Sequence, residues 1–437
     1  MLAALARRPV RRLLLPAAAL ALAVGAPASA PAATWHAPQT LTGPVSLSVP
    51  HVGLDARGDG VVAWVAGDRR IVAALRRAGG RFGAARVIAR AAAHGRVLEP
   101  QVAVSSGGDA VVAWAEEAPG RPHFRIRAAL AAGARAFAAP RTIGGSTTAW
   151  RAQPRVVAAP GGGLLAGWYR DDVGLQLAAR APGRPFGTPR TTLTLPYTPV
   201  WWAIAPDGRL HLVWTADGPG GTFVATAVGR LGGRFGPIGP LSQTGGSAPV
   251  LAVSPNDTPV AAWREPGAVL AAAGRPGFTL LDPAQTVSPA DAAASAPQLA
   301  AGPHSAAAVG WGGAASGWPP DRLGMPAWLA TRASGAPFAA AQALTPAGAF
   351  ALAPQLAFDA GGTLTAAVVW ADGADRHLEI RQGAAGAPLP AAAVTATSRP
   401  GDLHPVWTSA AVAAAGRFTA VAWTAGGQGP VRVFTQG

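Results

Sequence analysis

Short apolar runs recur along the chain, and eight of them end in a tryptophan. These residues are Trp64, Trp114, Trp168, Trp214, Trp263, Trp311, Trp370 and Trp423. Successive tryptophans are 46 to 59 residues apart. The runs are apolar at consecutive positions, as in 61–64 and 212–214, which is typical of a strand covered on both faces. One such strand per unit of this length predicts a repeat architecture of the β-propeller kind.

The same unit predicts three further strands. A proline that opens the first strand stands fourteen residues before the tryptophan in five units: Pro50, Pro100, Pro154, Pro249 and Pro297. A turn cluster such as 57–60 leads to the tryptophan strand, and a third strand such as 71–75 follows. The fourth strand is headed by a phenylalanine: Phe82, Phe137, Phe186, Phe235, Phe278 and Phe338. Four antiparallel strands make one propeller blade.

The two ends of the sequence complete the count of blades. The last unit reaches its third strand at 431–434 and has no fourth, whereas 35–41 matches the fourth-strand pattern of 137–143. We expect the N-terminal strand to complete the last blade and to close the ring, which removes exposed sheet edges. The prediction is an all-β, eight-bladed propeller of four-stranded antiparallel blades over residues 35–437, with seven blades as the alternative.

Residues 1–30 have the pattern of an export signal. Four arginines (Arg7, Arg8, Arg11 and Arg12) precede the apolar stretch 13–26 and the small-residue pattern 28–30. Pro31 leaves cleavage after Ala28 or Ala32 as alternatives, and Arg11-Arg12 leaves twin-arginine export open beside the ordinary route. Without cysteine the chain has no disulfide and no lipid-anchoring cysteine. We expect a secreted or cell-wall-associated protein without a membrane span.

Composition supports a large core and weakens arguments from charge. Half of the residues are hydrophobic and 13% are charged. The net charge is +15 and the chain contains no lysine, so every basic side chain apart from histidine is an arginine. These arginines are dispersed over the units, and the protein is predicted to be exported, so nucleic acid is not an expected partner. We expect the eight repeated tryptophans to pack between neighbouring blades.

The residues directly after the tryptophans are the first candidates for a ligand site. They are rich in carboxylates: Asp68, Glu116, Glu117, Asp171, Asp172, Asp217, Glu265, Asp372 and Asp375. Antiparallel connectivity places these loops and the loops entering each first strand on one face. Because arginines such as Arg125 and Arg127 fall on third strands, an acidic face is expected. Carboxylates there could bind a cation or a hydroxylated ligand, although aspartate beside glycine is also a common turn former.

Tryptophans outside the repeat positions fall near the same face. Trp150 and Trp407 precede first strands, and Trp318 lies in the long segment 312–322. Trp201 and Trp202 lie just inside a first strand, where inter-blade packing is the alternative role. From these acids and aromatic residues, with Tyr169 of the loop 169–172, we predict the ligand-binding set Asp68, Glu116, Trp150, Tyr169, Asp171, Asp172, Asp217, Glu265, Trp318, Asp372 and Trp407. No catalytic residue and no metal ligand is predicted.

Other chemistry finds little support in the sequence. The eight histidines lack zinc-site spacing, and neither a phosphate loop nor a nucleophile elbow is present. No cofactor is expected, with calcium at the acidic loops as the alternative.

The blade pattern over 35–437 resembles secreted bacterial propellers of the sialidase and BNR-repeat superfamily. Sialidases carry an arginine cluster, a tyrosine nucleophile with a nearby acid, and Asp-box motifs. In this chain Asp59-Gly60 lies four residues from Trp64, which is not the Asp-box spacing. Tyr169 does lie beside Asp171 and Asp172, but these residues belong to a single loop. No catalytic residue is therefore carried over.

The sequence favours an exported monomeric binding or scaffold module. Its expected partner is an extracellular glycan, a wall polymer or a protein. The alternative is a divergent sialidase-like glycoside hydrolase or lyase centred on Tyr169, Arg170, Asp171 and Asp172.

Overall fold

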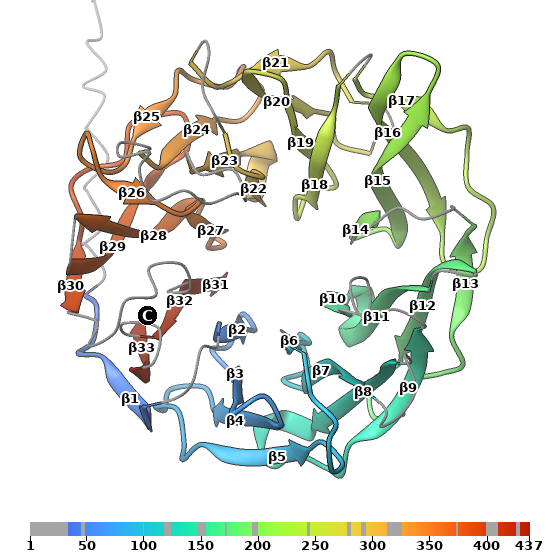
Figure 1. The fold of residues 1–437 in the computed structure, drawn as a ribbon, viewed down its shortest axis with the longest axis vertical. Coiled ribbons are helices and arrows are strands. Elements are labelled where there is room, and N and C mark those ends of the chain that lie inside the picture. Colours follow the sequence, from blue (N-terminus) through green and yellow to red (C-terminus); the bar gives the residue numbers. More distant parts are fainter. Residues whose placement is uncertain are drawn as a thin grey trace, which may run out of the picture. The chain divides into compact units, whose positions relative to one another are not determined.

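The computed structural model describes residues 34–44, 49–98, 100–117, 124–146, 154–170, 173–194, 200–242, 245–277, 281–289, 294–312, 326–372, 375–398, 410–424 and 429–437. Trp35–Gly437 form one compact unit. Its strands form eight antiparallel sheets, which are the blades of a ring (Figure 1). The predicted all-β propeller with eight blades is confirmed. The predicted signal 1–30 lies outside the described residues.

The first four blades each contain four strands, in order from the inner strand outward. Blade 1 is β2 (His51–Leu54), β3 (Gly60–Ala66), β4 (Arg70–Arg76) and β5 (Arg86–Arg90). Blade 2 is β6 (Gln101–Val104), β7 (Ala110–Glu117), β8 (Phe124–Ala131) and β9 (Arg141–Ser146). Blade 3 is β10 (Arg155–Ala159), β11 (Gly163–Arg170), β12 (Gly174–Arg180) and β13 (Arg190–Leu193). Blade 4 is β14 (Val200–Ile204), β15 (Arg209–Gly218), β16 (Gly221–Arg230) and β17 (Gly239–Pro240).

The other four blades follow the same order, with a split inner strand in blade 7. Blade 5 is β18 (Ser247–Val253), β19 (Pro259–Glu265), β20 (Ala268–Ala273) and β21 (Gln285–Thr286). Blade 6 is β22 (Gln298–Ala301), β23 (Ala307–Trp311), β24 (Trp328–Arg332) and β25 (Gln342–Ala343). Blade 7 is β26 (Phe350–Ala351) and β27 (Gln355–Phe358), both paired with β28 (Thr363–Asp372), then β29 (Asp375–Ala384) and β30 (Val394–Ser398). Blade 8 is β31 (Ala410–Ala415), β32 (Phe418–Thr424), β33 (Pro430–Gln436) and β1 (Gln39–Pro44).

The N-terminal strand closes the ring as predicted. β1 pairs antiparallel with β33, with Gln39 opposite Val433 and Thr40 opposite Arg432. Blade 8 is therefore built from both ends of the unit, so the closing contact joins residues almost the whole sequence apart. The outermost strand of blade 8 comes from the start of the chain, whereas its other three strands come from the end.

The predicted turn clusters connect the inner two strands of the blades. In blade 1, the N–H of Asp55 donates to the carbonyl of Asp59 and the N–H of Gly58 donates to the carbonyl of Asp55, both at 2.9 Å. Gly58 has a φ of +88°, a left-handed conformation that glycine adopts without a steric penalty. In blade 5, Asp257 takes the equivalent place at φ +64°, which aspartate tolerates better than most residues.

The fourth strands begin later than the sequence predicts. Phe82 makes an isolated bridge to Arg76, and the regular strand β5 starts only at Arg86. In blade 5, Leu281 makes the equivalent bridge to Gly274. The role requires a large apolar side chain over the blade seam, which leucine also provides, and Phe278 itself lies outside the described residues.

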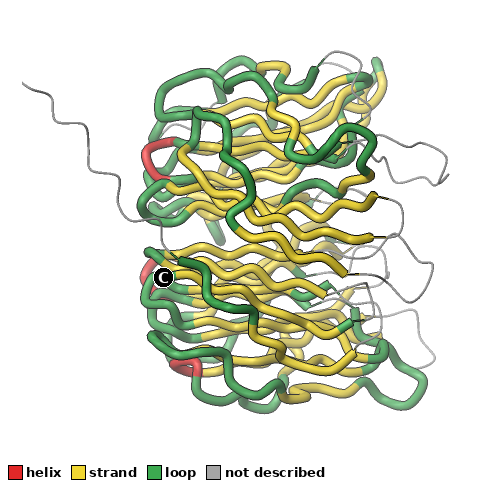
Figure 2. The backbone as a smooth tube through the Cα atoms, turned by 90° about the vertical axis from the view of Figure 1, so that its left-hand side faces the viewer, coloured by secondary structure: helices red, strands yellow, loops and turns green. Residues whose placement is uncertain are grey.

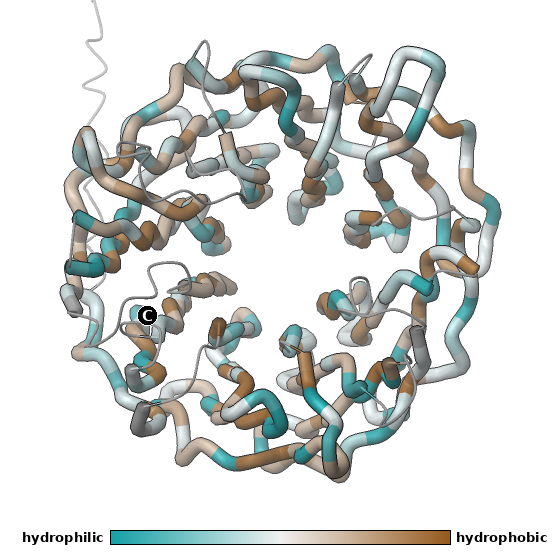
Figure 3. Tube along the Cα trace, viewed as in Figure 1, coloured by the Kyte–Doolittle hydropathy of each residue, from teal (hydrophilic) through white to brown (hydrophobic). Residues whose placement is uncertain are grey.

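The hydrophobic core is divided into one layer per blade seam. Each of the eight core clusters joins buried residues of two neighbouring blades, and each contains one repeated tryptophan: Trp64 (blades 8 and 1), Trp114 (1 and 2), Trp168 (2 and 3), Trp214 (3 and 4), Trp263 (4 and 5), Trp311 (5 and 6), Trp370 (6 and 7) and Trp423 (7 and 8). All are at most 9% exposed. Hydrophobic residues accordingly recur in every blade around the ring (Figure 3). The predicted inter-blade packing of these tryptophans is confirmed.

The strands run between two ends of the ring, which differ in their loops (Figure 2). The turn end carries the inner hairpin turns and the short 3-10 turns η1 (Ala132–Ala134), η3 (Pro160–Gly162) and η4 (Pro303–Ser305). The opposite end, which we call the entry face, carries the loops after the tryptophan strands and the loops that enter the inner strands. Among the described residues, no helix is long and apolar enough to cross a membrane.

Candidate ligand-binding face

The two kinds of loop on the entry face touch one another. The segment that enters blade 2 crosses from blade 1, where the N–H of Ala91 donates to the carbonyl of Arg69 at 2.8 Å. The N–H of Val97 then donates to the carbonyl of Asp68 at 2.8 Å, and Val97 bridges Glu116 of blade 2. The structure therefore brings two of the predicted site residues to the same segment of chain.

The predicted carboxylates differ in their exposure. Asp68 and Asp217 are exposed at the tips of their hairpins. Asp372 is exposed as well and contacts Nε2 of His377 at 2.9 Å, while the His377 ring stacks on Trp370 with centroids 4.0 Å apart. Glu265 is half-buried and accepts a hydrogen bond from the indole of Trp263 at 3.0 Å. These four residues lie on four different blades.

Glu116 and Tyr169 are buried instead. Glu116 is 7% exposed and pairs with the guanidinium of Arg127 at 3.1 Å. Tyr169 is 5% exposed. The other predicted site residues, Trp150, Asp171, Asp172, Trp318 and Trp407, lie outside the described residues.

The entry face does not separate acids from arginines in the way the sequence led us to expect. Arg127 of β8 pairs diagonally with Glu116 of the neighbouring strand β7, and Arg96 pairs with Glu117 at 2.6 Å. These carboxylates are therefore locally neutralised. No group of three or more histidines, aspartates and glutamates able to hold a metal ion occurs among the described residues.

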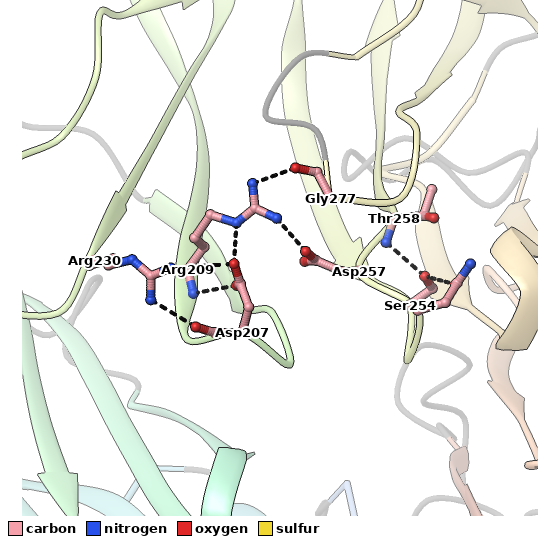
Figure 4. Close-up of polar contacts among 8 residues, drawn as sticks. Asp207, Arg209, Arg230, Ser254, Asp257, Thr258 and Gly277 are labelled. Carbon is pink, nitrogen blue, oxygen red and sulfur yellow. Dashed lines mark hydrogen bonds and ion pairs between the residues drawn. The ribbon is translucent and has the colours of Figure 1, made fainter.

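Acids also gather at the turn end, where they pair with arginines. Arg209 contacts Asp207 of its own blade and Asp257 of blade 5, and Arg230 reaches Asp207 as well (Figure 4). His211 lies within this cluster and is 2% exposed. Burial, aided by the nearby charge of Arg209, lowers the pKa of His211 to about 4 even though Asp257 and Asp207 act in the opposite direction. These contacts join blades 4 and 5.

Polar and aromatic side chains also recur at the entry-face ends of the inner strands. They are His51, Gln101, Arg155, Trp201, Gln298 and Gln355, and we call them the inner ring. Five of them are the first residue of their strand, and Trp201 is the second residue of β14. His51 pairs with Ala63 and Gln101 with Ala113, each the residue before a repeated tryptophan. Arg155, Trp201 and Gln298 have the same register, opposite Gly167, Val213 and Gly310. Gln355 differs, because it pairs with Ala367, three residues before Trp370.

Trp201 and Arg155 form the most developed contact of the inner ring. The Arg155 guanidinium carbon lies 4.5 Å from the centroid of the Trp201 ring, across the seam of blades 3 and 4. Trp201 is 38% exposed, whereas Trp202 beside it is 1% exposed within the core. Burial lowers the pKa of Arg155 to about 10, so the guanidinium stays charged at neutral pH. Its Nε is buried without a hydrogen-bond partner among the described residues.

His51 presents a neutral ring at the same level. Burial lowers its pKa to about 4, and its Nε2 is buried without a hydrogen-bond partner among the described residues. An uncharged imidazole nitrogen can donate or accept according to its tautomer. The inner ring therefore combines an exposed aromatic face with one cation, amides and a buried imidazole.

Sequence reasoning named Trp201 near the candidate face with inter-blade packing as the alternative, but it placed the other inner-ring residues in strands without assigning them to a site. The available signal was their position thirteen residues before the repeated tryptophan, where His51, Gln101, Arg155 and Gln298 directly follow the strand-opening proline. Polar residues at that position break an otherwise apolar strand. Trp201 stands at the same distance before Trp214.

Comparisons with known proteins show the propeller fold. No family model and no curated protein matches the chain. The lectin BP39L from Burkholderia pseudomallei matches with a TM-score of 0.52 at 12% identity, over 81% of this chain and 99% of the lectin. An ulvan lyase matches at 0.46 and 9% identity over 92% of this chain and 94% of the lyase. A leech intramolecular trans-sialidase matches at 0.43 and 9% identity over 64% and 68% of the two chains. At such identities the likeness shows the fold alone, and membership of the sialidase superfamily stays a prediction.

Proposed function

We propose that this propeller is a glycan-binding protein whose site is the inner ring on the entry face. The observation that carries the proposal is Trp201, a large aromatic side chain that is 38% exposed while its neighbour Trp202 is in the core. An exposed indole provides a flat apolar surface for the C–H face of a sugar ring. A lectin shares the fold, which supports this class of ligand.

The remaining groups of the inner ring suit the hydroxyl groups of a sugar. The amides of Gln101, Gln298 and Gln355 can each donate and accept hydrogen bonds. Arg155 lies against the Trp201 ring at 4.5 Å, which restrains the guanidinium and keeps a positive charge beside the stacking surface. Exposed carboxylates on the same face, such as Asp68 and Asp217, would extend the site outward.

Binding explains these residues better than glycoside hydrolysis does. Most glycosidases act through a pair of carboxylic acids on either side of the scissile bond. None of the six inner-ring side chains is a carboxylate. The alternative function, a sialidase-like glycoside hydrolase or lyase centred on Tyr169, remains a prediction. The side chain of Tyr169 is 5% exposed.

A glycan panel tests the proposal. The full-length protein would be titrated with neutral and acidic oligosaccharides while the intrinsic tryptophan fluorescence is recorded, because Trp201 is positioned to report occupancy. Saturable binding without release of new reducing ends supports a binding protein. An absence of saturable binding to every glycan, or turnover of a bound one, would contradict it. Because residues 1–30 are predicted to be an export signal, we expect the glycan to be extracellular.

A further inference from the structure

Neighbouring blades are joined on the outer side by a repeated glutamine clasp. The side chain of Gln39 donates through Nε2 to the carbonyl of Phe82 at 2.5 Å and accepts from the N–H of Phe82 at 3.1 Å. Gln285 makes the same pair of bonds to Phe338 at 2.8 and 2.9 Å. Gln342 makes them to Leu389 at 2.9 and 2.8 Å. The clasp joins blades 8 and 1, blades 5 and 6, and blades 6 and 7.

Arginine replaces glutamine at the equivalent position in blades 1, 2 and 3. Arg86, Arg141 and Arg190 are each the first residue of the outer strand, as Gln39 and Gln285 are. An arginine side chain has only donors, so it cannot accept a hydrogen bond from the backbone N–H of the next blade. The two-bond clasp therefore cannot form in these three seams, and a positive charge takes its place.

One of these seams contains a groove. It lies between blades 1 and 2, has a volume of about 820 Å³, and is lined by Arg77, Arg81 and Arg86 from blade 1 and by Arg135 and Phe137 from blade 2. Phe137 is the residue that a glutamine at position 86 would clasp, because it occupies the place that Phe82 has in blade 1. The groove is found where the arginine interrupts the clasp.

The walls of the groove are basic and partly apolar. All four arginines are exposed, and none of them pairs with a carboxylate of a described residue. Val87 in the same wall is 41% exposed, one of three large hydrophobic side chains exposed among the described residues. No aspartate or glutamate of the described residues lines the groove. Its volume is within the usual range for ligand sites.

We infer that this groove binds an acidic polysaccharide through its carboxylate or sulfate groups. Guanidinium groups bind planar or tetrahedral oxyanions through two parallel hydrogen bonds, and the apolar wall at Val87 and Phe137 suits the sugar rings between the charges. The choice of a polysaccharide over an acidic peptide rests on the proposed function. The site is separate from the inner ring, since it lies on outer strands (Figure 1).

Arg86→Gln tests the inference with a residue that the fold already uses at this position. The substitution removes one charge from the groove and supplies the group that clasps Phe82 elsewhere. Full-length protein would be titrated by calorimetry with oligogalacturonate, with a sulfated dextran oligosaccharide, and with neutral dextran of similar length. The wild type is expected to bind one or both acidic oligosaccharides and not the neutral one. Comparing the affinities of oligogalacturonate and the sulfated oligosaccharide shows whether the groove prefers carboxylate or sulfate groups.

We expect Arg86→Gln to weaken acidic oligosaccharide binding about tenfold or more, because a charge-assisted contact is lost. Arg190→Gln is the matched control, since it removes the same charge from an equivalent position in another seam, and it should leave binding within about twofold. Arg77→Gln combined with Arg81→Gln is a second test that does not alter the seam. Equal weakening by Arg190→Gln, unchanged binding in both groove variants, or equally tight binding of poly-glutamate would each overturn the inference.

Trp201→Ala separates this groove from the proposed function. It should leave binding of the acidic oligosaccharides at the groove unchanged. If the inner ring fails to bind any glycan while binding still depends on Arg86, the proposed function fails and the groove stands. If binding is lost in Trp201→Ala and kept in Arg86→Gln, the groove fails and the inner ring stands.

Discussion

Trp202 packs directly against Gly167, the residue before the repeated tryptophan Trp168. A Cβ atom at position 167 would lie 2.7 Å from Cζ2 of Trp202 and 2.5 Å from Cδ2 of Leu177. Trp202 comes from blade 4 and Gly167 from blade 3, so the missing side chain lets the two blades approach. The second indole of the Trp201-Trp202 pair is thereby fixed in the core, and the first is left at the surface.

The Gly167→Ala variant should therefore be destabilised. The added methyl group would force the indole or the Leu177 side chain to move, and overpacking of this kind costs about 1–3 kcal/mol. Thermal or urea denaturation of the purified protein measures the effect. Gly239→Ala is the control, because no atom of the described residues lies within 4 Å of a Cβ there. Equal stability of the Gly167→Ala variant and the wild type would show that the seam is looser than described.

The closing clasp can be tested at Gln39. Gln39→Ala removes both hydrogen bonds to Phe82 and leaves two backbone groups without that partner, so we expect a loss of about 1–3 kcal/mol in the free energy of unfolding. Gln176→Ala is the matched control, since the Gln176 amide makes a long contact of 3.5 Å to Thr191 within its own blade and does not bridge a seam through it. If both variants unfold at the same denaturant concentration, the clasp does not stabilise the ring.

The buried His211 makes stability depend on pH. Its pKa is about 4 in the folded protein against 6.5 for the free side chain, because burial disfavours the charged ring. Between these values the unfolded chain binds a proton that the folded protein does not, so stability falls as the pH is lowered from about 6.5 to 4. The two values imply a contribution on the order of 3 kcal/mol.

His211→Phe should remove part of this dependence, because His51, whose pKa burial also lowers to about 4, contributes the same kind of dependence. Urea denaturation of the wild type and the variant at a series of pH values between 4 and 7 measures it. The exposed His36→Phe serves as the control and should keep the slope of the wild type. A His211→Phe protein with the same slope as the wild type would contradict a neutral buried imidazole at this position.

Much of the fold follows from the sequence because its repeat is enforced by packing. Each seam requires one large aromatic side chain, which makes the spacing from Trp64 to Trp423 regular enough to count the blades. The pairing of β1 with β33 was also predictable, because a missing fourth strand leaves an unpaired edge. Leu281 escaped the phenylalanine pattern because the seam requires size and not aromaticity.

The site was less predictable because it depends on contacts between blades. Glu116 was expected at an acidic surface, yet the diagonal partner Arg127 comes from the neighbouring strand and neutralises it. Trp201 and Trp202 are adjacent in sequence, and because successive side chains of a strand point to opposite faces, only the structure shows which indole is exposed and which is buried. The contact of Arg155 could not be predicted from the sequence either, because its partner Trp201 belongs to the next blade.

The central claim, glycan binding at the inner ring, is tested most directly by the affinity of Trp201→Ala for a glycan that the panel has identified. Calorimetric titration would compare the wild type, Trp201→Ala and the control Ile238→Ala, which removes a hydrophobic side chain that is 54% exposed elsewhere on blade 4. We predict that Trp201→Ala binds about tenfold more weakly or worse, because it loses the apolar surface on which the sugar ring stacks, while Ile238→Ala binds as the wild type does. A folded Trp201→Ala protein with wild-type affinity would contradict glycan binding at the inner ring.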